Sequence, residues 1–249
     1  MRVIAKGVLL TTFVLVSAAA SAQTADEIIE KSIVASGGRE ALAKVTSRAT
    51  AGTMTVSTPG GEISGTIEVL NQAPNKSQTV ITLDLSAMGA GKMTIDQRFD
   101  GTSGYSSNSM QGETPVTGSQ LDTWRNAIFP SPFLDYKERG TKIELTGKEK
   151  IGDADAYALL LTPAKGPASR LWIDAATYQP VKAVLTVETA EVGPVEQTMV
   201  MSDFREVDGV KLPFKMVGSS TIQTFTLVVT KVEHNVTVDP ARFAKPAAK

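Results

Sequence analysis

The chain has 249 residues, of which 42% are hydrophobic, and its 25 basic and 26 acidic side chains leave a formal net charge of −1. Such a balanced charge is not typical of proteins that bind nucleic acid or anionic membranes. The complete lack of cysteine excludes disulfides, thiolate metal ligands, a cysteine nucleophile and a lipid anchor attached through cysteine.

The first 22 residues have the pattern of a secretory signal peptide. Two basic residues precede an apolar run over residues 8–16, and Ala-Ser-Ala at 20–22 fits a cleavage site. The run is shorter than the roughly 20 residues that a membrane-spanning helix needs. We therefore expect cleavage after Ala22 and export to the periplasm without stable membrane insertion. Residues 23–243 should form a single domain, and 244–249 a disordered tail.

A short amphipathic helix is expected after the cleavage site. Thr24 and Glu27 have the spacing of a capping box. Four apolar residues then fall on one helical stripe, namely Ala25, Ile28, Ile29 and Ile33. Gly37 and Gly38 end the pattern, and residues 39–44 add one more helical turn.

From residue 49 onward, apolar and polar side chains alternate. Met54 and Val56 alternate with threonines, Ile63 and Ile67 alternate with polar residues, and a turn at 60–61 separates the two runs. The same pattern predicts strands at 77–85, 92–99, 142–151, 156–162, 170–174, 181–188, 195–204, 211–217 and 224–232. The chain is therefore expected to be mainly β, with about eleven strands in a single, strongly curved antiparallel sheet.

The alternation fails between Gly104 and Gly140. Within this stretch, Leu121, Trp124, Ala127 and Ile128 share a helical face, and Pro130 and Pro132 follow them. Such a long excursion in an otherwise short-turned sheet is more often functional than accidental.

The sequence carries little that is typical of catalysis. His234 is the only histidine, no G-x-S-x-G is present, and we interpret His234 as an exposed residue at the end of a strand. Asp153 and Asp155 lack the further ligands of a calcium loop, and no phosphate-binding glycine motif occurs. We expect no catalytic residue, metal or cofactor, although a pair of carboxylates with glycosidase chemistry stays open as an enzymatic alternative.

The apolar side chains suggest either a core or a ligand cavity. A curved sheet of this size can enclose more volume than its own side chains fill, and methionine adapts to apolar ligands of varied shape. Several methionines and aromatic residues are close in sequence: Met54, Met88, Met93, Met110, Tyr105, Trp124, Phe129 and Phe133. Composition alone leaves both interpretations open.

Several segments resemble the LolA-like outer-membrane lipoprotein-sorting proteins. They are Phe99-Asp100-Gly101-Thr102-Ser103-Gly104-Tyr105, residues 135–140 (DYKERG), 147–149 (GKE), 156–159 (AYAL), 172–174 (WID) with Thr177-Tyr178, and 202–213 (SDFREVDGVKLP). The likeness spans roughly residues 25–232. It implies an open half-barrel with short helices that form a lid over the concave face, where acyl chains of lipoproteins or free lipids are held during transit.

The resemblance also implies partners, namely lipid or acylated lipoprotein, an inner-membrane release complex and an outer-membrane acceptor. Family members that carry lipoproteins have an Arg-Pro step after the second strand, whose arginine helps to hold the lid. Here the matching place has the sequence Gln72-Ala73-Pro74-Asn75, without arginine.

We predict that apolar residues line the cavity and lid. The candidates are Met54, Val56, Ile67, Ile81, Leu83, Met93, Tyr105, Trp124 and Phe129. Strand period does not decide which face of the sheet is concave, because a shift of one residue exchanges the two faces. The alternative hypothesis is a periplasmic sensor or scaffold module that binds a protein partner through the same sheet.

Overall fold

A computed structural model describes residues 23–189 and 193–246, so the predicted signal peptide lies outside the described residues. The helices are α1 (Ala25–Ala35), α2 (Gly38–Ala43) and α3 (Gly118–Asn126), with short 3-10 turns at Ser86–Met88 and Pro240–Arg242. The strands are β1 (Ser47–Thr58), β2 (Gly61–Gln72), β3 (Lys76–Asp84), β4 (Lys92–Phe99), β5 (Gly104–Asn108), β6 (Gly112–Val116), β7 (Lys142–Ile151), β8 (Ala154–Thr162), β9 (Ser169–Asp174), β10 (Pro180–Thr189), β11 (Gly193–Val207), β12 (Val210–Ser219) and β13 (Thr224–His234).

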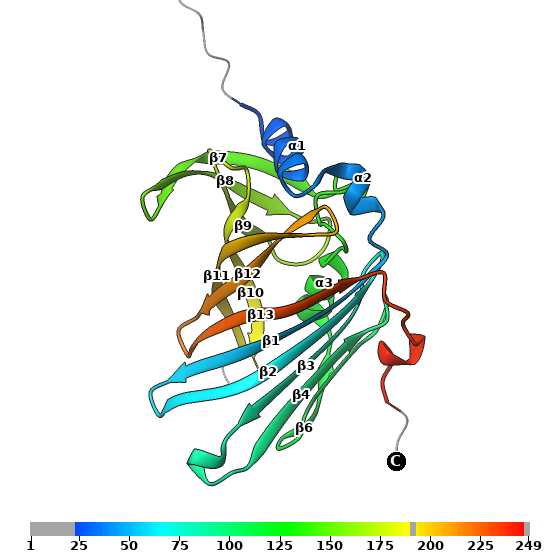
Figure 1. The fold of residues 1–249 in the computed structure, drawn as a ribbon, viewed down its shortest axis with the longest axis vertical. Coiled ribbons are helices and arrows are strands. Elements are labelled where there is room, and N and C mark those ends of the chain that lie inside the picture. Colours follow the sequence, from blue (N-terminus) through cyan, green and yellow to red (C-terminus); the bar gives the residue numbers. More distant parts are fainter. Residues whose placement is uncertain (1–22, 190–192, 247–249) are drawn as a thin grey trace, which may run out of the picture.

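All strands belong to one antiparallel sheet in the order β6-β5-β4-β3-β2-β1-β13-β12-β11-β10-β9-β8-β7. Strands β6 and β7 form its two edges and do not pair with each other, so the sheet is curved and open (Figure 1). The segment between them, which contains α3, connects one edge of the sheet to the other. The predicted fold class is confirmed.

The predicted number of strands is wrong, because the sheet has 13 strands within the described residues and not eleven. The two missed strands, β5 and β6, lie at the start of the stretch in which alternation fails. They are only five residues long, and they are rich in Gly, Ser and Thr. A short edge hairpin of this composition is held by pairing with β4, and therefore carries no apolar period of its own.

Helix α1 forms as its sequence predicts. The Thr24 hydroxyl accepts a hydrogen bond from the Glu27 amide at 3.2 Å, and the Glu27 carboxylate accepts one from the Thr24 amide at 2.9 Å. Ile28, Ile29 and Ile33 are at most 1% exposed and lie in the main core cluster. The predicted capping box and apolar stripe are confirmed.

Helix α3 is shorter than its apolar pattern suggests. It ends at Asn126, so Ala127 and Ile128 lie beyond the helix rather than on one face with Leu121 and Trp124. Within the described residues, no helix is long and apolar enough to cross a membrane.

After β13, the C-terminal segment passes down the right side of the sheet in the view of Figure 1 and contacts β3, β4 and β6. Phe243 is 1% exposed, the Ala244 carbonyl accepts a hydrogen bond from Arg98 at 3.2 Å, and Lys245 forms an ion pair with Glu113 at 2.6 Å. Ala244 and Lys245 therefore contact the sheet, although we expected a disordered tail from residue 244 onward. Residues 247–249 lie outside the described residues.

Candidate ligand-binding site

The pairing register determines which side chains share a face of the sheet. Directly opposed residues of antiparallel strands point to the same side. One row of such partners runs across eight strands: Leu145, Leu159, Leu171, Ala183, Met199, Gly218, Phe225 and Val56. The helices pack on this side, since Leu159 belongs to the same core cluster as α1. We call this side the concave face.

The concave face is covered at one end and less covered at the other. At the covered end, α1 and the segment 127–141 pack on β7–β9 in the largest core cluster. Beyond it lie two smaller clusters, one around Ile67 and Phe214 and the other around Met54, Val56 and Leu83. Their neighbours, which include Ile63, Met93 and Phe225, are only partly buried.

Eight of the nine predicted site residues lie on the concave face or in the elements that cover it. Met54, Val56, Ile67, Ile81, Leu83 and Met93 belong to the two smaller clusters, Trp124 is on α3, and Phe129 is in the main cluster. Tyr105 is the exception, because it points to the other face of the sheet. It is directly opposite Arg98, Arg98 is opposite Gln78, and Gln78 is opposite Leu70. Lys245 lies 5.7 Å from the centre of its ring.

Two other methionines that we associated with a cavity are not near it. Met88 and Met110 lie in hairpin turns and are 49% and 53% exposed. Phe225, Met199 and Phe214, which the prediction omitted, lie on the concave face instead. These residues lie on β13, β11 and β12, which come late in the chain. The three strands are joined to β1 only because β13 pairs with β1.

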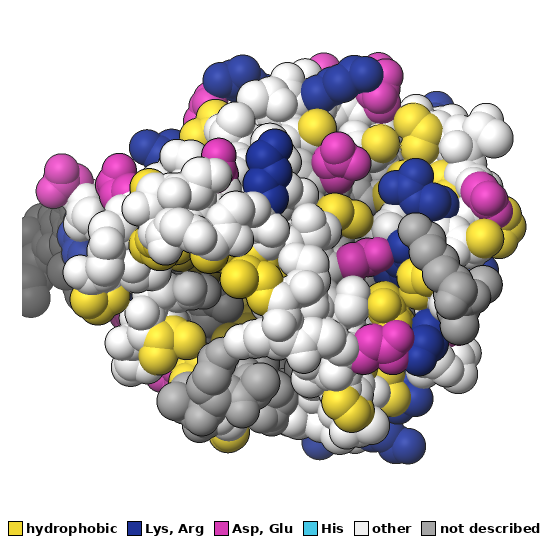
Figure 2. All heavy atoms as spheres, turned by 90° about the horizontal axis from the view of Figure 1, so that it is seen from below, with side chains coloured by type: hydrophobic (Ala, Val, Ile, Leu, Met, Phe, Trp, Pro, Cys, Tyr) yellow, Lys and Arg dark blue, Asp and Glu magenta, His cyan; other side chains and the backbone are white. Residues whose placement is uncertain are grey.

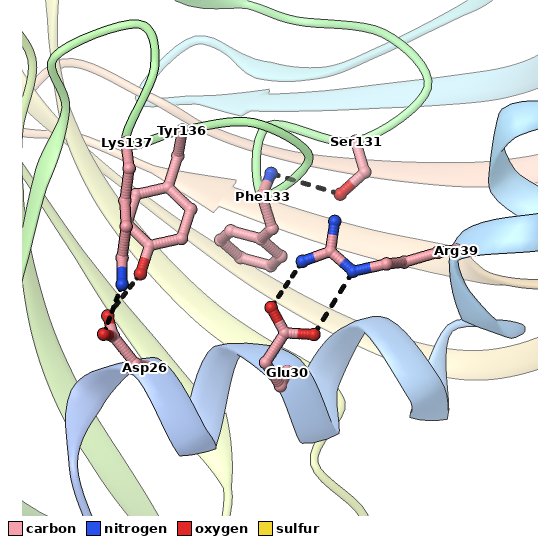
Figure 3. A network of polar contacts seen from close by, with 7 residues as sticks. All are labelled: Asp26, Glu30, Arg39, Ser131, Phe133, Tyr136 and Lys137. Atoms are coloured by element: carbon pink, nitrogen blue, oxygen red, sulfur yellow. Dashed lines mark hydrogen bonds and ion pairs between the residues drawn. The ribbon is translucent and has the colours of Figure 1, made fainter.

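We call α1, α2, α3 and residues 127–141 the lid. Polar contacts tie α1 to the rest of the lid (Figure 3). The Asp26 carboxylate accepts hydrogen bonds from the Lys137 ammonium and the Tyr136 hydroxyl, and Glu30 pairs with Arg39 of α2. Polar contacts therefore join α1 to α2 and to residues 127–141, in addition to the packing of α1 on the sheet.

Two pKa values in this network are shifted in opposite directions. The hydrogen bond from Lys137, followed by that from Tyr136, lowers the pKa of Asp26. Burial, followed by the hydrogen bond to Asp26, raises the pKa of Tyr136. At neutral pH, Asp26 is thus an anion that accepts from a protonated phenol and an ammonium group.

Helix α3 lies on the concave side, where it contacts β4 and β10. The Trp124 ring meets the Phe99 ring edge to face, with centroids 6.4 Å apart. A cavity of about 90 Å³ lies between α3 and the sheet and is lined by Ser77, Thr79, Gln97, Trp124 and Ala127. Seen from below, hydrophobic side chains lie around a hollow in the surface (Figure 2).

One cation on the concave face was missed by the sequence analysis. Arg48 in β1 points to the same side as His234 and Asn71, its register partners, and its guanidinium lies 5.0 Å from the centre of the Phe129 ring. Burial lowers the pKa of Arg48 to about 10. An arginine thus contacts the lid, although Gln72-Ala73-Pro74-Asn75 has none.

The prediction that His234 is exposed is wrong. It lies at the end of β13 as expected, but its side chain is only 2% exposed, and Nδ1 is 3.2 Å from Asp208. Burial, followed by the charge of Arg48, lowers the pKa of His234, so the ring is neutral at pH 7. His234 lies beside residues of α2, such as Ala41, and beside Asp208, which the strand pattern alone does not report.

The concave face offers apolar contact. Among the residues that the structure describes, no three His, Cys, Asp or Glu side chains gather as metal ligands would. Partly exposed apolar side chains next to a hollow are instead suited to bury an apolar ligand.

No protein-family model and no curated protein sequence matches the chain. Many solved structures are similar in fold, among them the following three. A DUF1329 family protein from Desulfovibrio piger has a TM-score of 0.55 at 14% identity, covering 88% of this chain and 97% of that chain. A LolA superfamily protein from Nitrosomonas europaea has a TM-score of 0.55 at 18% identity, with 90% and 99% covered. An outer membrane lipoprotein-sorting protein domain from Vibrio parahaemolyticus has a TM-score of 0.53 at 9% identity, with 88% and 95% covered. The chain therefore has the LolA-like fold that its sequence resemblance implies.

Proposed function

We propose that the protein is a periplasmic carrier, and not an enzyme, which holds lipid or the acyl chains of a lipoprotein against the concave face for transit towards the outer membrane. One observation carries the proposal. Apolar side chains continue along the concave face beyond the part that α1 and residues 127–141 cover, and Ile63, Met93 and Phe225 remain partly exposed there. An acyl chain gains about 0.8 kcal/mol for each methylene that such a surface removes from water.

The similar structures support this proposal at the level of fold. Two of them are named for the LolA superfamily or for lipoprotein sorting. Free lipid and lipoprotein acyl chains are both included, because the same apolar surface would bury either of them. A donor complex in the inner membrane and an acceptor in the outer membrane are the partners that a carrier of this kind requires.

Two substitutions in β2 test the role of the concave face. Ile63 is a partly buried member of the cluster around Met54, whereas Ser64 is the next residue and is exposed on the opposite face. Ile63→Asp places a charge where the acyl chain would lie, and Ser64→Asp places the same charge outside. Both positions are near the turn between β1 and β2.

The assay is a titration with a fluorescent fatty acid, using protein recovered from the periplasmic fraction and freed of bound lipid on an apolar resin. We expect saturable binding that Ile63→Asp weakens at least about tenfold, since burying an unpaired carboxylate is costly, while Ser64→Asp leaves it unchanged. Equal affinity in all three proteins, or no saturable binding, would contradict the proposal. Circular dichroism confirms that each variant is folded.

A further inference from the structure

The side chains on the concave face of β1–β4 change from apolar to polar along the strands. The end next to the turn between β1 and β2 is apolar and carries Met54, Val56 and Leu83. At the other end, directly opposed residues form two adjacent rows across the four strands. One row is Arg48, Asn71, Ser77 and Phe99, and the other is Thr50, Val69, Thr79 and Gln97. Six of these eight side chains are polar, and we call the two rows the polar end.

The polar end presents hydroxyl and amide groups beside a cavity. Ser77, Thr79 and Gln97 line the cavity of about 90 Å³ beneath α3. Among the residues that the structure describes, none forms a hydrogen bond with the side chains of Asn71, Ser77, Thr79 and Gln97, which are all partly buried. Such groups can bond to the polar part of a ligand, whereas an acyl chain would leave them unsatisfied.

The polar end also carries a cation. Arg48 is the only charged residue in the concave rows of β1–β6, and the structure describes every residue of these strands. Its side chain is partly buried beside Phe129 and forms no hydrogen bond or ion pair with any described residue. Burial lowers the pKa of Arg48 to about 10, so the guanidinium is still charged at neutral pH.

The elements around Arg48 do not supply an anionic partner for it within the part of the chain that the structure describes. Their carboxylates have partners of their own, namely Asp208 with His234, Asp122 with Arg125, and Glu40 with Lys44. A partly buried charge without a partner is costly to stability, and a bound anion would remove much of that cost. Arg48 is therefore suited to bind an anion from outside the protein.

We propose that Arg48 binds the anionic head group of the carried lipid, a carboxylate or a phosphate monoester, while the acyl chain of that lipid lies along the apolar end towards Val56. The planar guanidinium presents a fork of donors that matches either group, and the hydroxyl and amide groups of the polar end donate further hydrogen bonds. Val56 lies eight residues after Arg48 in β1, or about 26 Å at about 3.3 Å per residue, which leaves room for the chain. The inference rests on the proposed function and narrows it to free lipids with an anionic head group.

The test compares a fluorescent fatty acid with its methyl ester, which has the same chain without the charge. Protein is expressed as the full chain, recovered from the periplasmic fraction and freed of bound lipid on an apolar resin. The ligands are titrated into the wild type, Arg48→Met and the control Arg170→Met. Arg170 also lies over an aromatic ring, 5.7 Å from the centre of Trp172, but it alternates with Leu171 in β9 and points to the other face. Thermal melting verifies that both variants are folded.

We expect the wild type and Arg170→Met to bind the fatty acid at least about tenfold more tightly than the ester, because the ester loses the charge-assisted hydrogen bonds. Arg48→Met should bind both ligands with the affinity that the wild type has for the ester. Inorganic phosphate, which offers a charge without a chain, should not displace the fatty acid.

Three results would overturn the inference and leave the carrier proposal intact. They are equal affinity of the wild type for acid and ester, a preference for the acid that Arg48→Met retains, and displacement of the fatty acid by inorganic phosphate, which would assign Arg48 to a free anion. Failure of the wild type to bind either ligand would instead overturn both the inference and the carrier proposal.

Discussion

Replacement of Arg48 by methionine should stabilise the protein. The guanidinium lies between the sheet and the lid, and burial lowers its pKa to about 10, which corresponds to roughly 3 kcal/mol of destabilisation of the charged form. Its contact with the Phe129 ring, at 5.0 Å, returns about 2 kcal/mol at a desolvated site. Arg48→Met keeps a side chain of similar length without the charge, so the free energy of unfolding should rise by about 1 kcal/mol.

The sign of the pH dependence follows from the same pKa. The pKa of Arg48 is lower in the folded protein than in the unfolded chain, so the cost of the buried charge is fully present below about pH 10 and disappears as the pH rises towards the ordinary pKa of arginine. The gain from Arg48→Met should therefore be constant between pH 8 and pH 9, where His234 is neutral with or without the charge of Arg48.

Urea denaturation at pH 7, followed by tryptophan fluorescence, measures the change. The control is Arg205→Met, because Arg205 also lies over an aromatic ring, 4.7 Å from the centre of Phe214, but its side chain is 57% exposed. We expect this control to change the free energy of unfolding by less than about 0.5 kcal/mol in the destabilising direction. A loss of more than about 1 kcal/mol in Arg48→Met would refute the reasoning, since the charge would then be stabilised by more than its contact with Phe129.

Three further substitutions probe the lid and its surroundings. Trp124→Ala should weaken binding of the fluorescent fatty acid and cost about 1–2 kcal/mol, because the ring is only partly buried; an equal loss of thermal stability with and without lipid would mark Trp124 as core. Gly104→Ala would place its Cβ 2.6 Å from Val116, so urea denaturation should report a loss of about 1–3 kcal/mol; Gly60→Ala, whose Cβ meets nothing closer than 3.6 Å, is the control. The free energy of unfolding of the wild type should fall between pH 7 and pH 5, because the pKa of His234 is lower in the folded protein and the unfolded chain therefore takes up a proton first. His234→Gln should abolish this dependence on pH, and an unchanged dependence would contradict the lowered pKa of His234.

Strand positions could be predicted because burial on one face imposes a period of two. In β1 and β2, alternation at Met54, Val56, Ile63 and Ile67 gave both strands and the turn between them. The short hairpin of β5 and β6 has no such period, because β4 and pairing geometry hold it in place. Edge strands of this kind are visible only once their neighbours are known.

The lining of the site was largely predictable, but its orientation was not. A period of two places Met54 and Val56 on one face of their strand. The face of Tyr105, in contrast, depends on the register of β5 on β4, which is set by contacts between strands. The burial of Arg48 and His234 has a similar origin. Arg48 lies against Phe129 of the lid, and His234 lies against Asp208. Each contact joins two segments that are far apart in the sequence. Local patterns do not report such tertiary contacts.

Native mass spectrometry, combined with lipid extraction, tests the central claim most directly. The sample is protein purified gently from the periplasm of its own host, and the quantity measured is the mass of any ligand that stays bound. The carrier proposal predicts an acylated ligand in defined stoichiometry, which Ile63→Asp reduces and Ser64→Asp does not. A clean ligand-free mass, with no uptake of added lipids or lipopeptides, would mean that the apolar residues of the concave face serve only as core.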